Sequence, residues 1–205
     1  MISNAGAPRY RRADHQAIAQ FIGEGEKVLD VGCGDGQLME LLQAELKVRA
    51  RGLEISQSGV NRCLAKGLSV VQGDADEDLP VYPDNAFDVA ILSKTVQEMS
   101  RPAAVLRELS RIAPKIVVSF RNYGHWRVRW SLLTTGRMPT LGSSGPWYSE
   151  GARRICTAQD FADLAETLDL TIVKAAAISG ARADESSLSK LNWLSEEVVF
   201  VLERR

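Results

Sequence analysis

Hydrophobic residues along this chain fall into short runs of strand length that alternate with stretches of helical spacing. The alternation is typical of a parallel sheet covered by helices, so the sequence predicts an α/β fold. After a frayed start over residues 1–12, helices are expected at about 13–22, 38–46, 60–66, 102–112 and 157–168. Strands are expected at 27–31, 48–53, 68–72, 87–92, 115–120, 171–178 and 197–202.

Several helix boundaries carry recognisable signals. Ser100 or Arg101 can cap the helix whose first turn holds Pro102, and Thr157 with Asp160 has the spacing of a capping box. The polar stretch ARADESSLSKLNWLS is expected to connect the last two strands. The sequence thus predicts one domain over residues 1–205, with a seven-stranded, mostly parallel sheet and helices on both of its faces.

The regular alternation breaks after the fifth expected strand. Residues 121–155 combine aromatic residues and arginines without any lysine, and glycine and proline recur through TTGRMPTLGSSGP. This segment is expected to be an insertion that serves either as a lid or as a partner-binding element.

Composition narrows the class of protein. With 205 residues and 45% hydrophobic content the chain suits a single globular domain, and a net charge of -1 favours neither nucleic acid nor an anionic membrane as partner. The 3 cysteines and 2 histidines lack metal-ligand spacing, so no metal site is expected. No leader-like segment and no apolar run of about 18 residues is apparent, which favours a cytoplasmic protein.

The stretch VLDVGCGDG places a glycine-rich turn directly after the first expected strand. In open α/β sheets, ligands bind beyond the carboxyl ends of the strands, and this turn lies there. Gly32, Gly34 and Gly36 allow positive φ and a close approach of backbone to a ligand or to the strand. Cys33 is read as a small turn residue, and a plain glycine-rich turn is the alternative to a ligand cradle.

The spacing of the turn distinguishes between ligands. A dinucleotide fingerprint needs glycine at position 37, where this chain has Gln37, so a nicotinamide cofactor is disfavoured. Asp30 and Asp35 place carboxylates where a pyrophosphate would be repelled but where an amine and a sulfonium are stabilised. The pattern D-x-G-x-G-x-G therefore predicts S-adenosylmethionine or S-adenosylhomocysteine.

Acidic residues at the next two strand ends extend this predicted site. Glu54, followed by Ile55, can accept both ribose hydroxyls, and its alternative is a solvated carboxylate at a strand end. Asp74 can accept the adenine amine with Ala75 beside the ring, and its alternative is a solvated acidic loop. Ser93 begins a segment, up to residue 98, that is expected to line the reactive side of the cofactor.

These motifs resemble known families at two levels. The D-x-G-x-G-x-G turn, the acidic end of the second strand, the GD after the third and FDVAILS resemble class I S-adenosylmethionine-dependent methyltransferases. VLDVGCGDGQL taken with VQGDADEDLP, FDVAILSKTVQEM, VSFRNYGHWRVRWSLLTTGRMP, PWY and ICTAQDF is similar to the MetW family of bacterial methionine biosynthesis. The second resemblance runs nearly end to end.

The MetW resemblance implies a Rossmann-like methyltransferase fold and a partnership with the homoserine O-acyltransferase MetX. It implies no methyl acceptor. In that family the corresponding segment reads close to S-F-P-N-F-G-H-W. This chain has Arg121 in place of the proline, so the loop lacks the backbone constraint that proline would impose.

The segment after the fifth strand offers the remaining candidates. Tyr123 and His125 could face the cofactor as catalytic groups, and the alternative for His125 is that it caps or packs within the loop. The residues expected to contact a partner are aromatic side chains and arginines, types enriched in binding hot spots. They are Trp126, Arg127, Arg129, Trp130 and Trp147. The alternative is a lid whose tryptophans complete the core.

Three hypotheses follow from the sequence. The first is a MetW-type protein that binds S-adenosylmethionine, as a sensor or as an enzyme, and acts with MetX. The second is a methyltransferase for a small molecule or a carboxylate. The third, a nicotinamide-dependent oxidoreductase, is opposed by Gln37. Self-association remains open at this level.

Overall fold

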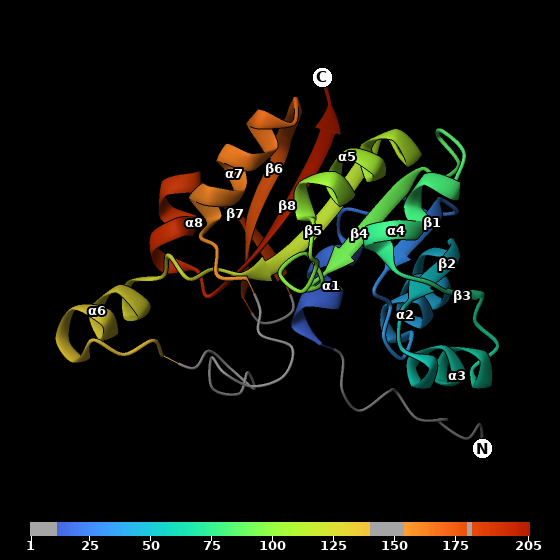
Figure 1. The fold of residues 1–205 in the computed structure, drawn as a ribbon, viewed down its shortest axis with the longest axis horizontal. Helices are drawn as coiled ribbons and strands as arrows, with labels where there is room; N and C mark the ends of the chain where they lie inside the picture. The colour runs from blue at the N-terminus through green and yellow to red at the C-terminus, as the bar shows by residue number, and fades with distance from the viewer. Residues whose placement is uncertain (1–11, 140–153, 180–181) are drawn as a thin grey trace, which may run out of the picture.

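A computed structural model of the chain describes residues 12–139, 154–179 and 182–205, which build one sheet with helices on both faces (Figure 1). The helices are α1 Ala13–Ala19, α2 Gln37–Leu46, α3 Gln57–Ala65, α4 Ala75–Asp78, the 3-10 turn η1 Leu79–Val81, α5 Pro102–Ile112, α6 Trp126–Thr135, α7 Ala158–Thr167 and α8 Leu188–Leu194. The strands are β1 Lys27–Val31, β2 Arg49–Glu54, β3 Val70–Gln72, β4 Val89–Ser93, β5 Lys115–Arg121, β6 Leu170–Ser179, β7 Arg182–Glu185 and β8 Glu197–Arg204.

The strand order is β3-β2-β1-β4-β5-β8-β6-β7. The first five strands in this order run parallel, whereas β8 is antiparallel to both β5 and β6, and β6 is antiparallel to β7. The carboxyl ends of β1 to β5 therefore meet at one edge of the sheet. The order reverses at β1, which pairs with β2 on one side and β4 on the other, and a ligand site is expected beyond that point.

The predicted α/β class and the mostly parallel sheet are confirmed, but the sheet of the described residues has 8 strands rather than seven. The additional strand is β7, which lies with α8 in the stretch that the sequence indicated to be a polar connection. β7 is a four-residue edge strand with charged residues, and Leu191 is the buried residue of α8, so neither shows a clear hydrophobic period.

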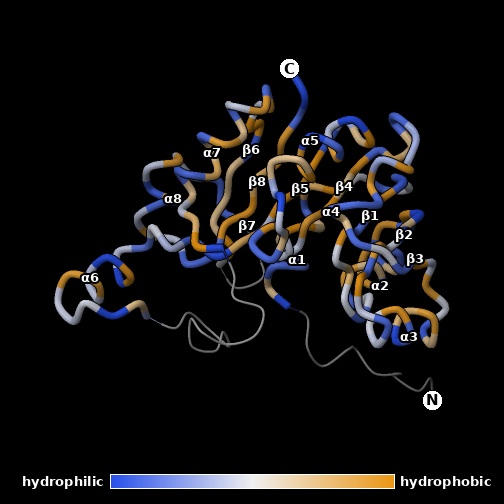
Figure 2. The backbone as a smooth tube through the Cα atoms, viewed as in Figure 1, coloured by the Kyte–Doolittle hydropathy of each residue, from blue (hydrophilic) through white to orange (hydrophobic). Residues whose placement is uncertain are grey.

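Two hydrophobic cores lie on opposite faces of the sheet. On one face, α1, α2 and α3 contribute side chains such as Ile18, Leu42 and Cys63. On the other face, α5 and α7 pack over the sheet, and the rings of Phe120, Phe161 and Phe200 cluster with centroids 4.7 to 5.6 Å apart. Figure 2 shows the same hydrophobic concentration along the central strands. This burial supplies the main favourable term in folding.

The predicted helix caps have different outcomes. Thr157 and Asp160 form the expected capping box at the start of α7. Arg101 occupies the N-cap position of α5, but its side chain makes no capping bond there. Instead, the carboxylate of Asp76 accepts the backbone N–H groups of Ser100 and Arg101, at 2.7 Å each. The start of α5 is thus held by a residue from α4.

None of the helices in the described ranges is both long and apolar enough to cross a membrane. In the same ranges, no three or more His, Cys, Asp or Glu side chains come together in a group that could hold a metal ion.

Candidate functional site

The glycine turn between β1 and α2 leaves open space at one position. Gly32, Gly34 and Gly36 all have positive φ, at 72°, 60° and 78°. A Cβ atom on Gly32 would lie 2.3 Å from the Thr95 side chain, and one on Gly36 would lie 2.3 Å from Leu68. A Cβ on Gly34 would meet nothing within 4 Å. Packing within the protein therefore requires glycine at positions 32 and 36, whereas the space next to Gly34 is open and could hold part of a ligand.

The contact of Gly36 differs from the one expected. Its missing side chain allows approach to Leu68 and to Cys63 of α3, rather than packing of the following helix near the first strand. Cys33 lies beneath the turn, buried, with its Sγ 3.9 Å from the Cys63 Sγ. Burial raises the pKa of the Cys33 thiol, so this side chain is a packed, protonated group.

Glu54 at the end of β2 braces the turn. Its Oε2 accepts the backbone N–H of Gly34 and its Oε1 accepts that of Ser56, each at 2.8 Å. The side chain is largely buried between the turn and α3, where a Cβ on Gly59 would lie 2.8 Å from its Cγ. Each carboxylate oxygen retains a second lone pair, so Glu54 can hold the turn and still accept hydroxyl groups.

A cleft of about 180 Å³ lies beyond the carboxyl ends of β1, β2 and β3. The predicted site residues among its lining are Gly32, Ile55, Asp74 and Ala75, and Thr95 and Glu98 come from the segment expected to line it. Further lining residues, which the sequence did not single out, are Val31, Leu53, Gly73, Asp76, Met99 and Ser100. The structure thus gathers three strand ends and the loop after β4 around one cavity.

The acidic cluster after β3 is ordered by hydrogen bonds. The Oδ1 of Asp74 accepts the backbone N–H of Asp76 at 2.8 Å and so caps α4. The backbone N–H of Asp74 in turn donates to Asp78 Oδ2 at 2.7 Å. Asp74 is therefore fixed at the rim of the cleft, and Asp76 is fixed beside it by its bonds to the start of α5.

Asp30 is a buried carboxyl group with an unused acceptor. Its Oδ1 has no hydrogen-bond partner among the described residues, and the side chain is almost fully buried. Burial raises the pKa of Asp30 to about 7, while Arg12 opposes the shift and Glu54 adds to it. A cationic donor near this oxygen would supply the missing hydrogen bond and would lower the free-energy cost of ionising the Asp30 carboxyl group.

Four of the eleven residues predicted to bind the cofactor line the cleft. The seven that lie outside its lining are Asp30, Cys33, Gly34, Gly36, Gln37, Glu54 and Ser93. Gln37 donates through Nε2 to Asp35 Oδ2 at 2.6 Å on the exposed start of α2. Burial acts to raise the pKa of Asp35, but the bonds from Gln37 and the charge of Lys66 hold it below its ordinary value. Ser93 ends β4 with a buried Oγ that, like Asp30 Oδ1, finds no partner within the described ranges.

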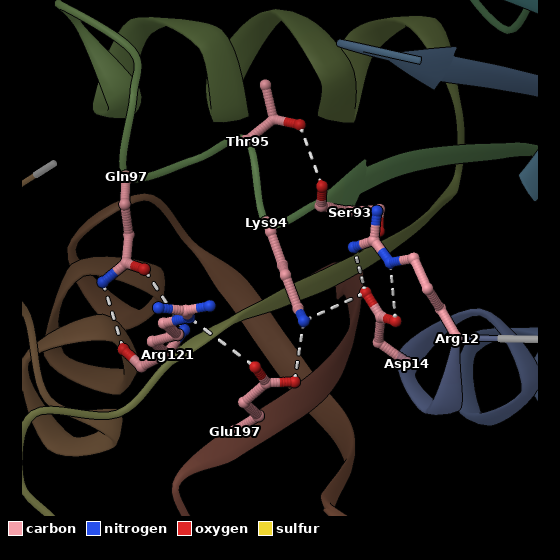
Figure 3. Close-up of polar contacts among 8 residues, drawn as sticks. All are labelled: Arg12, Asp14, Ser93, Lys94, Thr95, Gln97, Arg121 and Glu197. Carbon is pink, nitrogen blue, oxygen red and sulfur yellow. Dashed lines mark hydrogen bonds and ion pairs between the residues drawn. The ribbon is translucent and has the colours of Figure 1, made fainter. Parts of the chain in front are cut away.

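Beyond β4, an ion-pair cluster joins three elements (Figure 3). Lys94 has a positive φ of 60°, and its Nζ lies 2.9 Å from Glu197 Oε2 of β8 and 3.4 Å from Asp14 Oδ2 of α1. Arg12 also donates to Asp14, at 3.1 Å. Burial acts to raise the pKa of Asp14, but Arg12 and Lys94 hold it below its ordinary value. This cluster could not be expected from local spacing, because Asp14, Lys94 and Glu197 are far apart in the chain.

The segment after β5 is tied to the protein rather than directed into the cleft. The amide of Asn122 donates to the carbonyls of Leu191, Asn192 and Ser195 and accepts from Gly124 and Ala158, at 2.9 to 3.1 Å. The backbone N–H of Tyr123 donates to the Cys156 carbonyl at 3.1 Å. Neither Tyr123 nor His125 lines the cleft.

His125 is the N-cap of α6. Its Nδ1 accepts the backbone N–H of Arg127 at 3.3 Å, and burial lowers the pKa of the imidazole. The imidazole lines a different pocket, of about 320 Å³, together with Trp126, Arg127, Ala177, Ile178, Leu194, Ser195 and Glu196. The structure therefore agrees with the capping interpretation of His125.

Helices α6 and α8 lie at the same end of the molecule (Figure 1), and both expose large aromatic and aliphatic side chains. We call this the α6–α8 surface; its residues, 41% to 80% exposed, are Trp126, Trp130, Leu133, Trp193 and Leu194. The Arg129 guanidinium lies 4.9 Å from the ring centroid of Trp193, which links the two helices. Arg127 lies 5.5 Å from the Trp126 ring centroid. Trp147 is outside the described residues.

The sequence left open that this segment is a lid whose tryptophans complete the core. The exposure of the two tryptophans of α6 argues against that alternative. Val128 is the buried residue of this helix, while Trp126 and Trp130 are exposed. The contribution of α8 was missed from the sequence, although LNWL carries two large apolar residues beside the buried Leu191.

The fold, with its cleft beyond the carboxyl ends of the parallel strands, is that of the class I S-adenosylmethionine-dependent methyltransferases. A solved structure of an S-adenosylmethionine-dependent methyltransferase from Thermotoga maritima, described as a possible histamine N-methyltransferase, superposes with a TM-score of 0.70. The superposition covers 94% of this chain and 88% of the Thermotoga chain at 18% sequence identity, so the likeness concerns the fold. Within this class, the chain belongs to the family described as "Methionine biosynthesis protein MetW", which matches residues 12–202. Both predicted resemblances are confirmed.

Two curated relatives differ in what they share with the chain. The bifunctional methionine biosynthesis protein MetXA/MetW of Rhodopirellula baltica is 29% identical over 169 residues, which are 78% of this chain and 27% of that protein. The fatty-acid O-methyltransferase of Mycolicibacterium smegmatis is 35% identical over 103 residues, 48% of this chain and 37% of that enzyme. The chain thus spans well under half the length of either relative. The family and the fold together support S-adenosylmethionine as the cofactor.

Proposed function

We propose that this protein binds S-adenosylmethionine in the cleft and acts with a homoserine O-acyltransferase of the MetX type in methionine biosynthesis. The cleft beyond the strand ends, lined by Gly32, Asp74 and Ala75 beside the turn that Glu54 braces, is the observation that carries the binding of the cofactor. The protein would then work in the cytoplasm, alongside the enzymes of that pathway.

The residues around the cleft suit the chemical groups of this cofactor. Glu54 would accept the ribose hydroxyls, and Asp74 the adenine amine, with Ile55 and Ala75 beside the ring. The buried carboxyl of Asp30 would stabilise the cationic groups of the methionine portion. Cys33 and Gln37 would shape the turn, and Ser93 would support the end of β4. When bound, the cofactor supplies a methyl group on a sulfonium; the residues named here bind and orient it.

The α6–α8 surface is the proposed docking site for the acyltransferase. Tryptophan and arginine dominate binding hot spots, and this surface presents Trp126, Trp130 and Trp193 with Arg127 and Arg129 among them. Trp147 belongs to the proposal as a predicted partner contact. The fused MetXA/MetW relative supports the pairing, because a single chain there joins the two functions named for it.

We further propose that cofactor binding regulates the partnership. Regulation requires that the affinity for the partner differ between the cofactor-bound and the cofactor-free protein. The protein should be co-purified with the acyltransferase, and the affinity of the pair measured with and without S-adenosylmethionine. A change of about fivefold or more is expected. An unchanged affinity would rule out the sensing role, and the absence of any complex would rule out the partnership.

Methyl transfer to a carboxylate is the second candidate function. The match to a fatty-acid O-methyltransferase favours it, over 48% of this chain. Methyl transfer needs mainly an acceptor held in line with the sulfonium, so the lack of a dyad at the cleft is no obstacle. Incubation with methyl-labelled cofactor and cell extract would show a labelled product if this function is correct. No transfer in any extract, from a protein that binds the cofactor, would oppose it.

A further inference from the structure

The loop after β4 has two sides with different contacts. Thr95, Glu98, Met99 and Ser100 line the cleft. Gln97, between them in sequence, is buried and bonded to the end of β5 instead. A single short loop therefore touches both the cofactor cleft and the segment that leads into α6.

The contact of Gln97 with β5 is a paired one. Its Nε2 donates to the backbone carbonyl of Arg121 at 3.1 Å, and its Oε1 accepts the backbone N–H of Arg121 at 3.2 Å. A proline at position 121 would have no N–H to donate, so the second bond depends on the arginine found here. The amide also lies 3.4 Å from the Cys156 Sγ.

Arg154 holds the same loop from the other end of the insertion. Its backbone N–H donates to the carbonyl of Gln97 at 2.7 Å. Its guanidinium donates to the carbonyl of Met99 at 2.8 Å through Nε and to that of Ser100 at 2.6 Å through an Nη. Bonds from a charged donor are about twice as strong as neutral ones, so this residue links the loop firmly to the end of the insertion.

From these contacts we infer that Gln97 and Arg154 are positioning residues that couple the cofactor cleft to the α6–α8 surface. The inference rests on the proposed binding of S-adenosylmethionine in the cleft. Residues 121 and 154, near the two ends of the insertion, both bond to the loop whose other residues line the cleft. A ligand against Met99 and Ser100 restricts this loop, and the bonds to Arg121 and Arg154 transmit the restriction to α6.

The coupling runs through the hydrogen bonds of Gln97 to residue 121 and then along the backbone of residues 122–125 into α6, which gives it a physical test. Hydrogen exchange of the backbone amides of residues 121–135 should be measured with and without saturating S-adenosylmethionine, and calorimetry should measure the affinity for the cofactor. In the unmodified protein the cofactor is expected to slow hydrogen exchange of residues 121–135 by about fivefold or more. A factor of about five is the lower end of the coupling commonly found between two binding sites.

Arg154→Ala and Gln97→Leu are expected to keep cofactor affinity within about threefold and to reduce the slowing to less than about twofold. Arg62→Ala, on the exposed side of α3, is the control and should behave as the unmodified protein. Binding of the cofactor without slower exchange at 121–135, or full slowing in both variants, would overturn the inference. Failure of the unmodified protein to bind the cofactor would instead refute the proposed function, and this inference with it.

Discussion

The Glu54 carboxylate accepts the backbone N–H of Gly34, with 2.8 Å between the two atoms. The bond joins the end of β2 to the middle of the glycine turn, across twenty positions of sequence. It means that the residue proposed to hold the ribose also sets the shape of the turn that is proposed to contact the cofactor. A change at Glu54 should therefore affect both the free energy of unfolding and the affinity for the cofactor.

Glu54→Gln is expected to lower the free energy of unfolding by about 2 kcal/mol, because the amide presents an NH₂ group to one of the two N–H donors that the carboxylate now accepts. Cofactor affinity should fall by about tenfold or more. Denaturant titration and calorimetry measure the two quantities. Glu40→Gln, which breaks an exposed ion pair with Lys66, should cost about 0 to 1 kcal/mol and leave affinity unchanged. Equal effects of the two variants would contradict the role of Glu54.

Gly34→Val is expected to abolish cofactor binding in a protein that still folds. A Cβ there meets no protein atom within 4 Å, so the added side chain is expected to extend into the space proposed for the ligand. The positive φ adds strain of about 1 to 3 kcal/mol. Gly25→Val is the matched control, because Gly25 also has a positive φ and open surroundings but lies before β1. Calorimetry should show affinity lost in the first variant and kept in the second, and retained affinity in Gly34→Val would refute the proposed site.

Asp30→Asn is expected to stabilise the protein at pH 8 by about 2 kcal/mol and to have little effect near pH 4. The pKa is raised from the ordinary 3.8 to about 7 in the folded state, so the folded protein resists ionisation. The favourable contribution of the neutral carboxyl is complete below about pH 3.8 and is lost as the pH rises through about 7. The full pKa shift corresponds to roughly 4 kcal/mol of stability that the unmodified protein loses at high pH. The asparagine variant avoids this loss but recovers only part of it, because its amide still lacks hydrogen-bond partners.

Denaturant titrations of both proteins from pH 4 to pH 8 test this prediction. The curves of the free energy of unfolding should diverge as the pH rises. The same variant should bind the cationic cofactor about tenfold more weakly at pH 8, because it cannot ionise. A constant difference in stability across the pH range would show that Asp30 does not titrate as inferred.

Trp130→Ala and Trp193→Ala are each expected to weaken binding of the acyltransferase by about thirtyfold, or about 2 kcal/mol, as for hot-spot residues. Both side chains are at least half exposed, so folding should change little. Val81→Ala, at a side chain 82% exposed on η1, provides the control. Binding of each variant to the immobilised acyltransferase measures this change in affinity. Equal affinity of all three variants would place the docking site elsewhere.

The glycine turn could be placed from the sequence because its signals are local: a buried strand, glycines at fixed spacing and a helix follow each other within twenty residues. The same holds for the capping box of Thr157 and Asp160. In both cases the interacting groups are neighbours in the chain, so their spacing carries the geometry.

Asn122 shows why other parts could not be placed. It follows a strand whose carboxyl end lies at the binding edge, yet its amide is bonded to carbonyls about seventy positions away. Lys94 with Glu197 and Arg154 with Met99 are likewise contacts between distant segments. Such contacts depend on how the sheet is ordered, which local spacing does not encode.

The position of β8 has a consequence for how the chain can fold during synthesis. This strand is the last in sequence, yet it lies between β5 and β6 and pairs with both. Until residues 197–204 have left the ribosome, β5 keeps one open edge and the β6–β7 hairpin has no place in the sheet. Unpaired edges of this kind promote aggregation, so nascent chains are expected to be prone to aggregate until β8 has been synthesised.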